Sequence, residues 1–279
     1  MTNARGDDSL LAGWDAAEVT RQYVVRGGGN VSDPGEAAAL AALDGDLDGA
    51  QVLDLGIGAG RTTRLLADRA ARYVGVDVSA PMVELARQIA PDADLRVGDA
   101  RDLSWCPDGS VDVVVFSFNG IDNVDHAGRA SVLRECRRVL RPGGRLLFSS
   151  LNRDAPGWPQ KPWHLRPPAS TGLARALGTV DTAARAARHP AGTVRSWRNY
   201  LSQRHLHQDG EGWSRRLLRA HEFRFLVYFA PVPVTAAQVR QAGFVVEVAW
   251  ANQGHRVDPD QPDRVAGWVH YLCRTADGD

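Results

Sequence analysis

Short apolar runs alternate with helical patterns through the middle of the chain. Apolar runs that read as buried strands lie near residues 51–55, 73–77, 94–97, 111–116 and 145–149. Segments with apolar residues at helical spacing connect them near residues 61–69, 80–89 and 127–139. Such regular alternation is typical of a parallel sheet covered by helices on both faces. The pattern therefore predicts an α/β fold.

The pattern changes on both sides of this region. Residues 152–230 carry several prolines and then stretches rich in Arg, His and Trp, so we expect a helical insertion, which we call the cap. Regular structure returns as a helix at 235–243 and strands at 244–250 and 268–274. The predicted organisation is an N-terminal helical lid (1–48), a ligand-binding core (49–151), the cap (152–230) and a C-terminal part of the core (231–279).

Two helices are predicted before the first strand, at residues 14–26 and 34–43, with Ser32 or Asp33 beginning the second and Pro34 in its first turn. Gly27 to Gly29 separate them. A helix tethered by glycines just before a ligand site is typical of a mobile lid. Packing of its apolar stripe on the core explains the pattern equally well.

The strand at 51–55 leads into a glycine-rich loop that opens the next helix. Gly56, Gly58 and Gly60 have GxGxG spacing, and glycine permits both positive φ and close approach of the backbone to a ligand. Asp77 follows 23 residues after Asp54, at the end of the neighbouring strand. A carboxylate there can accept hydrogen bonds from two ribose hydroxyls. Together these features predict a nucleotide-like ligand.

Two alternatives to this interpretation are a dinucleotide site and a turn without a ligand. A GxGxxG site would need its third glycine at Arg61. Asp54, two residues before Gly56, would repel a pyrophosphate but attract an ammonium or sulfonium group. We therefore expect a cationic ligand.

With Asp54, the three glycines and Asp77, the segment resembles the S-adenosylmethionine site of the class I methyltransferases. The resemblance covers residues 51–151 and, more loosely, 235–274. It implies a Rossmann-like seven-stranded sheet with an antiparallel last strand, the cap between strands five and six, and S-adenosylmethionine as cofactor. The cofactor-binding residues it implies are Tyr23, Arg26, Asp54, Gly56, Gly58, Gly60, Asp77, Val78, Met82, Asp99, Ala100, Ser117 and Phe118.

The resemblance also implies particular roles. Asp99 would accept a hydrogen bond from the adenine amine and the Ala100 amide would donate to the ring, whereas a solvated loop Asp is the alternative. Val78 and Met82 would sandwich the adenine, although a Met at this spacing also suits a core. Arg26 would bind the cofactor carboxylate.

The loop after the strand at 111–116 should face the reacting end of the cofactor. Phe118-Asn119-Gly120 lacks the Asn or Asp followed by Pro-Pro and an aromatic residue that adenine and glutamine methyltransferases carry, which disfavours a nucleic-acid acceptor. Residues 116–122, 138–144 and 148–152 resemble a subgroup that includes the ovothiol-biosynthesis methyltransferase domain. Asn123 and Leu151 replace its Tyr and His, so the resemblance implies a small, polar, nitrogenous or hydroxylated metabolite. The candidate acceptor-binding residues are Asn119, Asp122, Asn152, Arg204, Trp213 and Tyr228.

Methyl transfer is an in-line displacement that depends mainly on alignment and exclusion of water. A base matters only for an acceptor that carries a proton, and histidine suits proton removal at neutral pH. The candidates are His164, His205, His207 and His221, of which we predict the last three as catalytic, with Tyr228 and Asp122 behind them. A structural role is the alternative for each.

Composition limits the remaining possibilities. The three cysteines, Cys106, Cys136 and Cys273, form no CxxC, so we expect neither a disulfide framework nor a metal site. The chain has zero formal net charge, but the cap holds 13 of the 33 basic residues and only 5 of the 33 acidic ones. Such a segment suits nucleic acid, an anionic small substrate or a solvated helical face.

No apolar stretch approaches the roughly 18 to 20 residues that span a bilayer, and the N-terminus lacks a signal-peptide pattern. We therefore expect a cytoplasmic monomer or homodimer that methylates N or O of a small metabolite, with natural-product biosynthesis as one setting. The alternatives are an RNA methyltransferase and an S-adenosylmethionine-binding protein with non-methylating chemistry.

Overall fold

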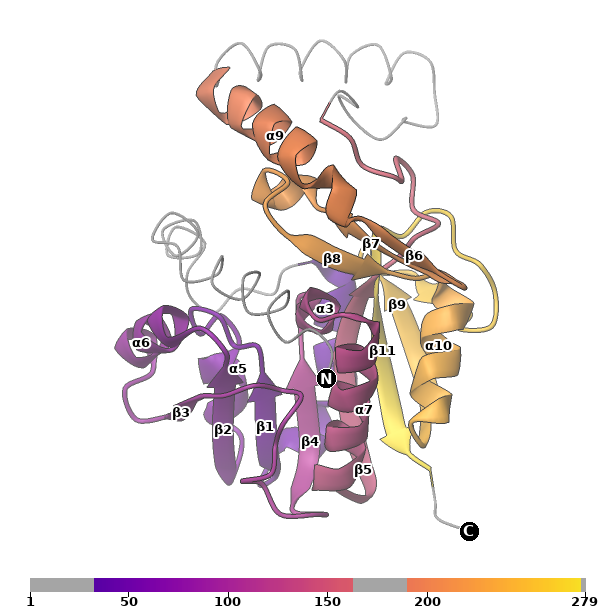
Figure 1. Cartoon of the computed structure of the whole chain (residues 1–279). Coiled ribbons are helices and arrows are strands. Elements are labelled where there is room, and N and C mark those ends of the chain that lie inside the picture. Colours follow the sequence, from indigo (N-terminus) through magenta and orange to yellow (C-terminus); the bar gives the residue numbers. More distant parts are fainter. Residues whose placement is uncertain (1–32, 163–189, 277–279) are drawn as a thin grey trace.

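The computed structural model describes residues 33–162 and 190–276, and a central sheet forms its core (Figure 1). The sheet has eight strands in the order β10-β9-β11-β5-β4-β1-β2-β3. Their bounds are β1 (Gln51–Leu55), β2 (Arg72–Asp77), β3 (Asp94–Val97), β4 (Val111–Phe116), β5 (Leu140–Leu151), β9 (Phe244–Ala251), β10 (Arg256–Val257) and β11 (Trp268–Thr275). Strands β1 to β5 pair in parallel, and β11 is antiparallel to both of its neighbours. The seven predicted strands are present, and the two-residue β10 adds an eighth.

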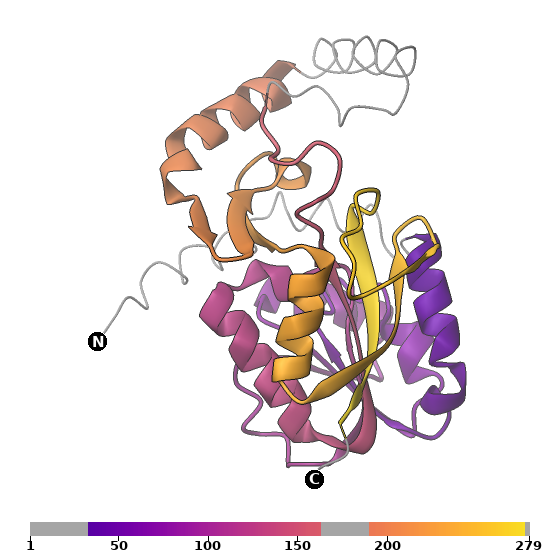
Figure 2. The ribbon, with the colours of Figure 1, turned by 90° about the vertical axis from the view of Figure 1, so that its right-hand side faces the viewer.

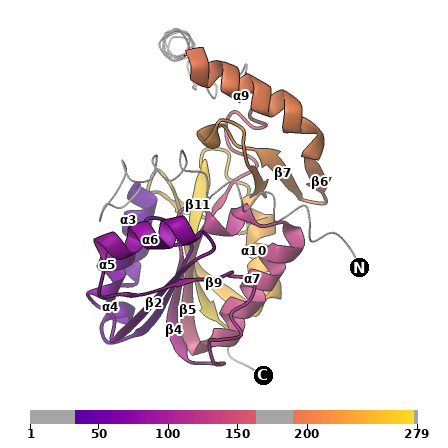
Figure 3. The same ribbon diagram turned by 60° about the vertical axis from the view of Figure 1, so that its left-hand side comes forward.

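Helices cover both faces of this sheet (Figures 2 and 3). They are α3 (Pro34–Ala42), α4 (Asp44–Leu47), α5 (Thr63–Ala67), α6 (Ala80–Ile89), α7 (His126–Val139) and α10 (Val232–Gln241). The alternation of side chains along β4 builds both layers. Val113 and Val115 pack with α3 to α6, whereas Val114 packs with α7 and α10. The sheet is therefore buried on both faces, as the uninterrupted apolar runs indicated.

Asp33 begins helix α3, in agreement with the sequence. Its carboxylate accepts a hydrogen bond from the Glu36 amide at 2.9 Å, and Pro34 occupies the first turn. The helix predicted at residues 14–26 and the glycines that follow it lie outside the described residues.

The cap lies between β5 and β9, as expected, but it is not all helical. It contains α9 (Pro190–Gln203) and an antiparallel sheet of β6 (Gln208–Gly210), β7 (Trp213–Leu217) and β8 (Leu226–Phe229). The expectation of helices is therefore wrong for β6, β7 and β8. Strand β8 is entirely buried and packs against β5 and the short 3-10 helix η1 (Gly120–Asn123) of the core. Its run of β-branched and aromatic residues suits a strand.

Candidate functional site

A cavity of about 650 Å³ opens between the carboxyl ends of the core strands and the cap. Its core side is formed by the loops that follow β1, β2, β3 and β4, which is the edge of the sheet where ligands bind in open α/β folds. Its cap side is formed by residues 155–160, by residues 218–221 and by β8. The volume is in the range of small-molecule sites.

The structure brings nine of the thirteen predicted cofactor residues to the wall of this cavity. They are Gly56, Gly58, Asp77, Val78, Met82, Asp99, Ala100, Ser117 and Phe118. Of the other four, Tyr23 and Arg26 lie outside the described residues, and Asp54 and Gly60 do not line the cavity.

The glycine loop is shaped by left-handed backbone conformations. Gly56 and Gly58 have φ of 65° and 53°, and the amide of Gly56 donates to the Val76 carbonyl at 2.7 Å. A Cβ on Gly58 would point into open space, so a side chain there would fill the cavity. Gly60 has a packing role, because a Cβ there would lie 3.1 Å from Ala86 of α6.

Asp77 is fixed at the cavity wall by two backbone amides. Its Oδ2 accepts from Gly58 at 2.8 Å and its Oδ1 from Ser79 at 2.9 Å. The two amides orient the carboxylate, which has about four acceptor positions in all. The arrangement suits a pair of hydroxyl groups.

Asp54 does not have the position expected from the sequence. It is buried beneath the glycine loop, where its Oδ2 accepts from Thr62 Oγ1 at 3.0 Å and from the Tyr73 hydroxyl at 2.8 Å. Its Oδ1 has no hydrogen-bond partner among the described residues. Burial, which outweighs these hydrogen bonds, raises the pKa of Asp54 to about 7. The carboxyl group therefore links β1 to β2 and to the start of α5, and it does not line the cavity.

The loop after β3 carries Asp99, Ala100 and Arg101 to the cavity. The Asp99 carboxylate already accepts from the Arg101 guanidinium, with Nη2 to Oδ2 at 2.6 Å and Nε to Oδ2 at 2.9 Å. Any ligand at Asp99 shares the carboxylate with this arginine. Sequence reasoning missed Arg101, although it lies only two residues away.

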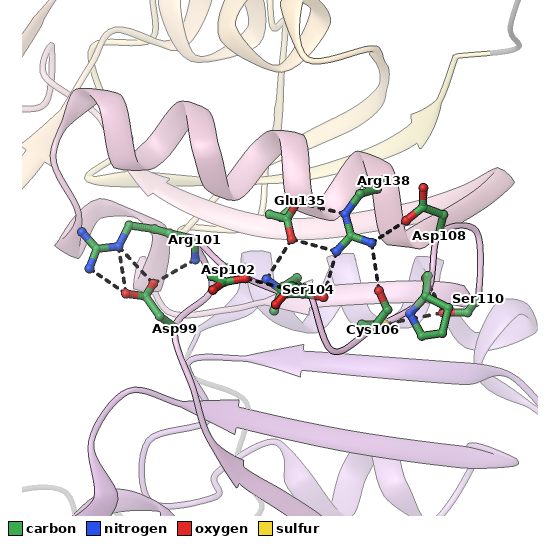
Figure 4. A network of polar contacts seen from close by, with 11 residues as sticks. Asp99, Arg101, Asp102, Ser104, Cys106, Asp108, Ser110, Glu135 and Arg138 are labelled. Carbon is green, nitrogen blue, oxygen red and sulfur yellow. Dashed lines mark hydrogen bonds and ion pairs between the residues drawn. The ribbon is translucent and has the colours of Figure 1, made fainter.

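Two side chains of α7, Glu135 and Arg138, form hydrogen bonds with the segment that follows Asp99 (Figure 4). Glu135 Oε2 accepts from the Leu103 amide at 2.8 Å. Arg138 donates to the carbonyls of Leu103 and Cys106, each at 2.8 Å, and pairs with Asp108 at 2.6 Å. The helix thus fixes the loop that presents Asp99 to the cavity.

The loop after β4 has an unusual backbone. Phe118 and Asn119 are not glycines but have φ of 53° and 60°, a conformation that costs energy and is found preferentially at functional sites. Arg61 lies over the Phe118 ring at 5.5 Å and donates to Ser117 Oγ at 3.2 Å. A paired interaction with the buried Glu36 of α3 holds Arg61 in place.

Of the predicted acceptor-binding residues, Asn119 and Asn152 line the cavity. The Asn119 Oδ1 is buried without a hydrogen-bond partner among the described residues. The Asn152 amide donates to the carbonyls of Asp263 and Ala266, so this side chain holds the loop before β11.

Asp122 does not reach the cavity, which corrects its predicted role. It is fully buried on η1, where its carboxylate accepts from Arg129 Nη1 at 2.5 Å, Ser150 Oγ at 2.8 Å and the Leu151 amide at 2.6 Å. Such a group ties the core together. The sequence did not reveal Arg129 as its partner, because the two side chains meet only when η1 and α7 fold.

Arg204, Trp213 and Tyr228 also lie outside the cavity wall. Arg204 is exposed. Trp213 stacks on His126 with ring centroids 4.8 Å apart, and the Tyr228 hydroxyl contacts His126 Nδ1 at 3.0 Å. These two aromatic residues dock the cap onto the start of α7.

Among the three predicted catalytic histidines, only His221 lines the cavity. It lies on the 3-10 helix η3 (Arg219–His221), with its ring against the edge of Phe225. His205 is exposed, and His207 packs against Tyr200. Burial lowers the pKa of His207 to about 4. The predicted catalytic role therefore lacks support for His205 and His207.

Several cavity residues were not predicted from the sequence. The largest are Trp158, Phe229 and Trp268, together with Gln160. They come from the cap and from β11, whose approach to the core loops no local pattern reveals.

Within residues 33–162 and 190–276, no three His, Cys, Asp or Glu side chains are grouped so as to hold a metal ion. The same part of the chain contains no helix that is both long enough and apolar enough to cross a membrane.

Comparisons with known proteins agree with this arrangement. The family profile described as "Methyltransferase domain" matches residues 52–144. A probable S-adenosylmethionine-dependent methyltransferase of Mycolicibacterium smegmatis is 39% identical over 136 residues, 47% of this chain and 51% of that protein. A demethylmenaquinone methyltransferase of Beutenbergia cavernae is 40% identical over 121 residues, 43% of this chain and 48% of that protein. The matched region thus spans about half the length of these relatives.

Solved structures share the fold. A 1,6-didemethyltoxoflavin-N1-methyltransferase of Burkholderia thailandensis, solved with its substrate and S-adenosylhomocysteine, has a TM-score of 0.57 and 15% identity, with 99% of this chain and 92% of that chain covered. An S-adenosylmethionine-dependent methyltransferase of Mesorhizobium loti has a TM-score of 0.54 and 19% identity, with 87% and 98% covered. At such identities the likeness concerns the fold.

Proposed function

We propose that this chain, which belongs to the class I S-adenosylmethionine-dependent methyltransferases and has S-adenosylmethionine as its cofactor, methylates a small molecule held beneath its cap. The observation that carries the proposal is the single cavity shared by the core loops and the cap. One side of its wall has the glycine loop and Asp77, and the other has apolar and aromatic cap residues. Cofactor and acceptor can therefore meet in one enclosed space.

The residues on the core side fit the cofactor. Gly58 leaves open space where a side chain would stand, and Asp77 presents acceptor oxygens suited to the ribose hydroxyls. Asp99 and Ala100 would bind the adenine, with Arg101 orienting the Asp99 carboxylate. When bound, S-adenosylmethionine supplies the electrophilic methyl group.

The chain's own contribution is alignment and exclusion of water. The constrained loop at Ser117, Phe118 and Asn119 lines the cavity on the core side, and residues of the cap line the other side. Holding two reactants in line contributes on the order of 7 to 11 kcal/mol in well-oriented systems. This geometry supports transfer to N or O without a covalent enzyme intermediate.

The volume of the cavity, about 650 Å³, favours a small-molecule acceptor over a nucleic acid, and part of the positive charge of the cap is paired within the cap. Three of its arginines are engaged in ion pairs, Arg216 with Asp209 and both Arg195 and Arg224 with Glu222. The ubiquinone-biosynthesis O-methyltransferase of Xanthomonas oryzae, 34% identical over 113 residues, is named for a small-molecule pathway.

His221 is the proposed base for an acceptor that loses a proton. It is the predicted histidine that lines the cavity, and general bases contribute roughly 10²- to 10⁴-fold to rate. We expect His221→Ala to lower kcat by that range while S-adenosylhomocysteine affinity stays within a few-fold. His205→Ala is the matched control, since His205 is exposed outside the cavity. Equal rates in the two variants would remove His221 from the reaction.

The test of the proposed function is label transfer. The purified protein is incubated with S-adenosylmethionine labelled in its methyl group and with fractionated metabolite extracts, and fractions that contain natural products are tested first. We expect S-adenosylhomocysteine and one labelled small molecule as products. Label in added RNA would support the nucleic-acid alternative. Binding of the cofactor without any transferred label would support non-methylating chemistry.

A further inference from the structure

Three aromatic residues from separate segments line the cavity. Trp158 and Phe229 have ring centroids 4.5 Å apart, and Trp268 lines the same cavity from the start of β11. The Trp268 indole is fixed in orientation, because its Nε1 donates to Asp33 Oδ2 at 3.0 Å. Val227 and Leu218 complete an apolar wall. Such a surface suits a flat, apolar ring.

An arginine of the cap, Arg219, lines the same cavity. Arg219 is held at two points, because its amide donates to Gln160 Oε1 at 2.9 Å and its Nη2 donates to the Lys161 carbonyl at 2.6 Å. Partial burial lowers the pKa of Arg219 from its ordinary value, which reflects the cost of removing a cation from water. An anionic ligand group would meet a planar donor that Lys161 already orients.

Resting on the proposed methyl transfer, we infer that the acceptor is a planar aromatic compound that carries a carboxylate or a similarly acidic oxygen. Its ring lies among Trp158, Phe229 and Trp268, and its anionic group binds Arg219. Arg219 and His221 lie on the same 3-10 helix, η3. In this arrangement Arg219 orients the anionic group of the acceptor, and His221 faces the acceptor atom that is methylated.

The inference is tested by calorimetry on the full chain saturated with S-adenosylhomocysteine. The probes are 4-hydroxybenzoate, its uncharged analogue 4-hydroxybenzamide and the saturated analogue trans-4-hydroxycyclohexanecarboxylate. We expect the benzoate to bind at least tenfold more tightly than either analogue. Arg219→Gln should abolish the preference for the acid over the amide, and Trp158→Leu should reduce the preference for the aromatic ring.

Arg198→Gln is the matched control, because Arg198 is an exposed cap arginine that does not line the cavity. Equal affinity for acid and amide in the wild type, or no binding of any probe by a protein that binds S-adenosylhomocysteine, would overturn the inference. A loss of S-adenosylhomocysteine affinity in Arg219→Gln as large as the loss for the acid would assign Arg219 to the cofactor. Failure of the wild type to bind S-adenosylhomocysteine would count against the proposed function itself.

Discussion

Two aspartates at the ends of neighbouring strands, Asp54 and Asp77, have different surroundings in this structure. Asp77 lines the cavity, whereas Asp54 lies below it with the hydroxyls of Thr62 and Tyr73. Spacing predicted that both are close to the glycine loop. Which way the Asp54 carboxyl points depends on hydroxyls from two other elements, and these meet only in the folded protein.

Asp77 and Gly58 should both be needed for cofactor binding. A carboxylate that accepts two hydrogen bonds from the ribose contributes roughly 1.5 to 3 kcal/mol for each bond, so Asp77→Ala should weaken S-adenosylhomocysteine binding at least about a hundredfold. Gly58→Val should do the same by filling the cavity. Calorimetric titration measures both effects.

The controls separate binding from general damage to the fold. Asp94→Ala removes an exposed carboxylate paired with Arg96, and Gly109→Val imposes a side chain at another positive φ, 61°, away from the cavity. Both should keep wild-type affinity. Unchanged affinity in Asp77→Ala and Gly58→Val would contradict the site.

Asp54 should make stability depend on pH. Its folded pKa of about 7 lies above the ordinary value of 3.8, so between these values the folded protein retains a proton that the unfolded chain has lost. Stability therefore falls as pH rises through this window, by up to about 4 kcal/mol for three pKa units. Asp54→Asn should remove this part of the slope.

Urea unfolding at pH 5 and pH 8 measures the effect. The free energy of unfolding of Asp54→Asn minus that of the wild type should be larger at pH 8 than at pH 5. Asp122, whose pKa burial raises to about 6, is present in both proteins and cancels in the comparison. Parallel pH profiles for the two proteins would show that Asp54 is ionised in the folded state.

At the scale of elements, periodicity predicted the helices and strands that their own sequence specifies. It missed the strands whose formation depends on contacts with residues far away in the sequence. Helix α6 has the predicted bounds, because its apolar stripe and Pro81 specify it without help. Strands β7 and β8 lie in the segment rich in Arg, His and Trp that was expected to be helical. Their pairing with each other and the burial of β8 against the core favour strands instead.

Helix α7 should influence cofactor affinity without touching the cofactor. Arg138→Gln removes several charged hydrogen bonds to the loop that carries Asp99, and we expect S-adenosylhomocysteine binding to weaken roughly 5- to 30-fold. Amide hydrogen exchange in residues 99–106 should speed up, which distinguishes positioning from a change elsewhere. Arg138→Lys should restore part of the affinity.

Arg134→Gln is the control on the same helix, since Arg134 contacts Ser131 within α7. It should leave both affinity and exchange unchanged. If Arg138→Gln binds the cofactor normally while the loop exchanges faster, the loop is not part of the cofactor site.

For the whole molecule, the sequence predicted the sheet, its helical layers and the position of the insertion. The cofactor side of the cavity could be predicted because its motifs lie within about 100 residues of each other in the sequence. The acceptor side could not, because it is built from the cap, β11 and the start of α3, which are far apart in the sequence. Arg219, Trp158 and Trp268 come together only through that long-range assembly. The division predicts separable roles for the core and the cap.

Removing the cap should therefore eliminate turnover but spare cofactor binding. The Arg153 amide donates to the Ala230 carbonyl at 3.1 Å, so a short linker can join residue 153 to residue 230 without moving the core. S-adenosylhomocysteine affinity should stay within about tenfold of the wild type, about 1.4 kcal/mol, because Gly58, Asp77 and Asp99 all belong to the core. The truncated protein should melt at a lower temperature, since Tyr228 no longer covers Arg129. A circular dichroism spectrum confirms that the sheet persists, and methylation of the native acceptor by this protein would show that the acceptor binds outside the cap.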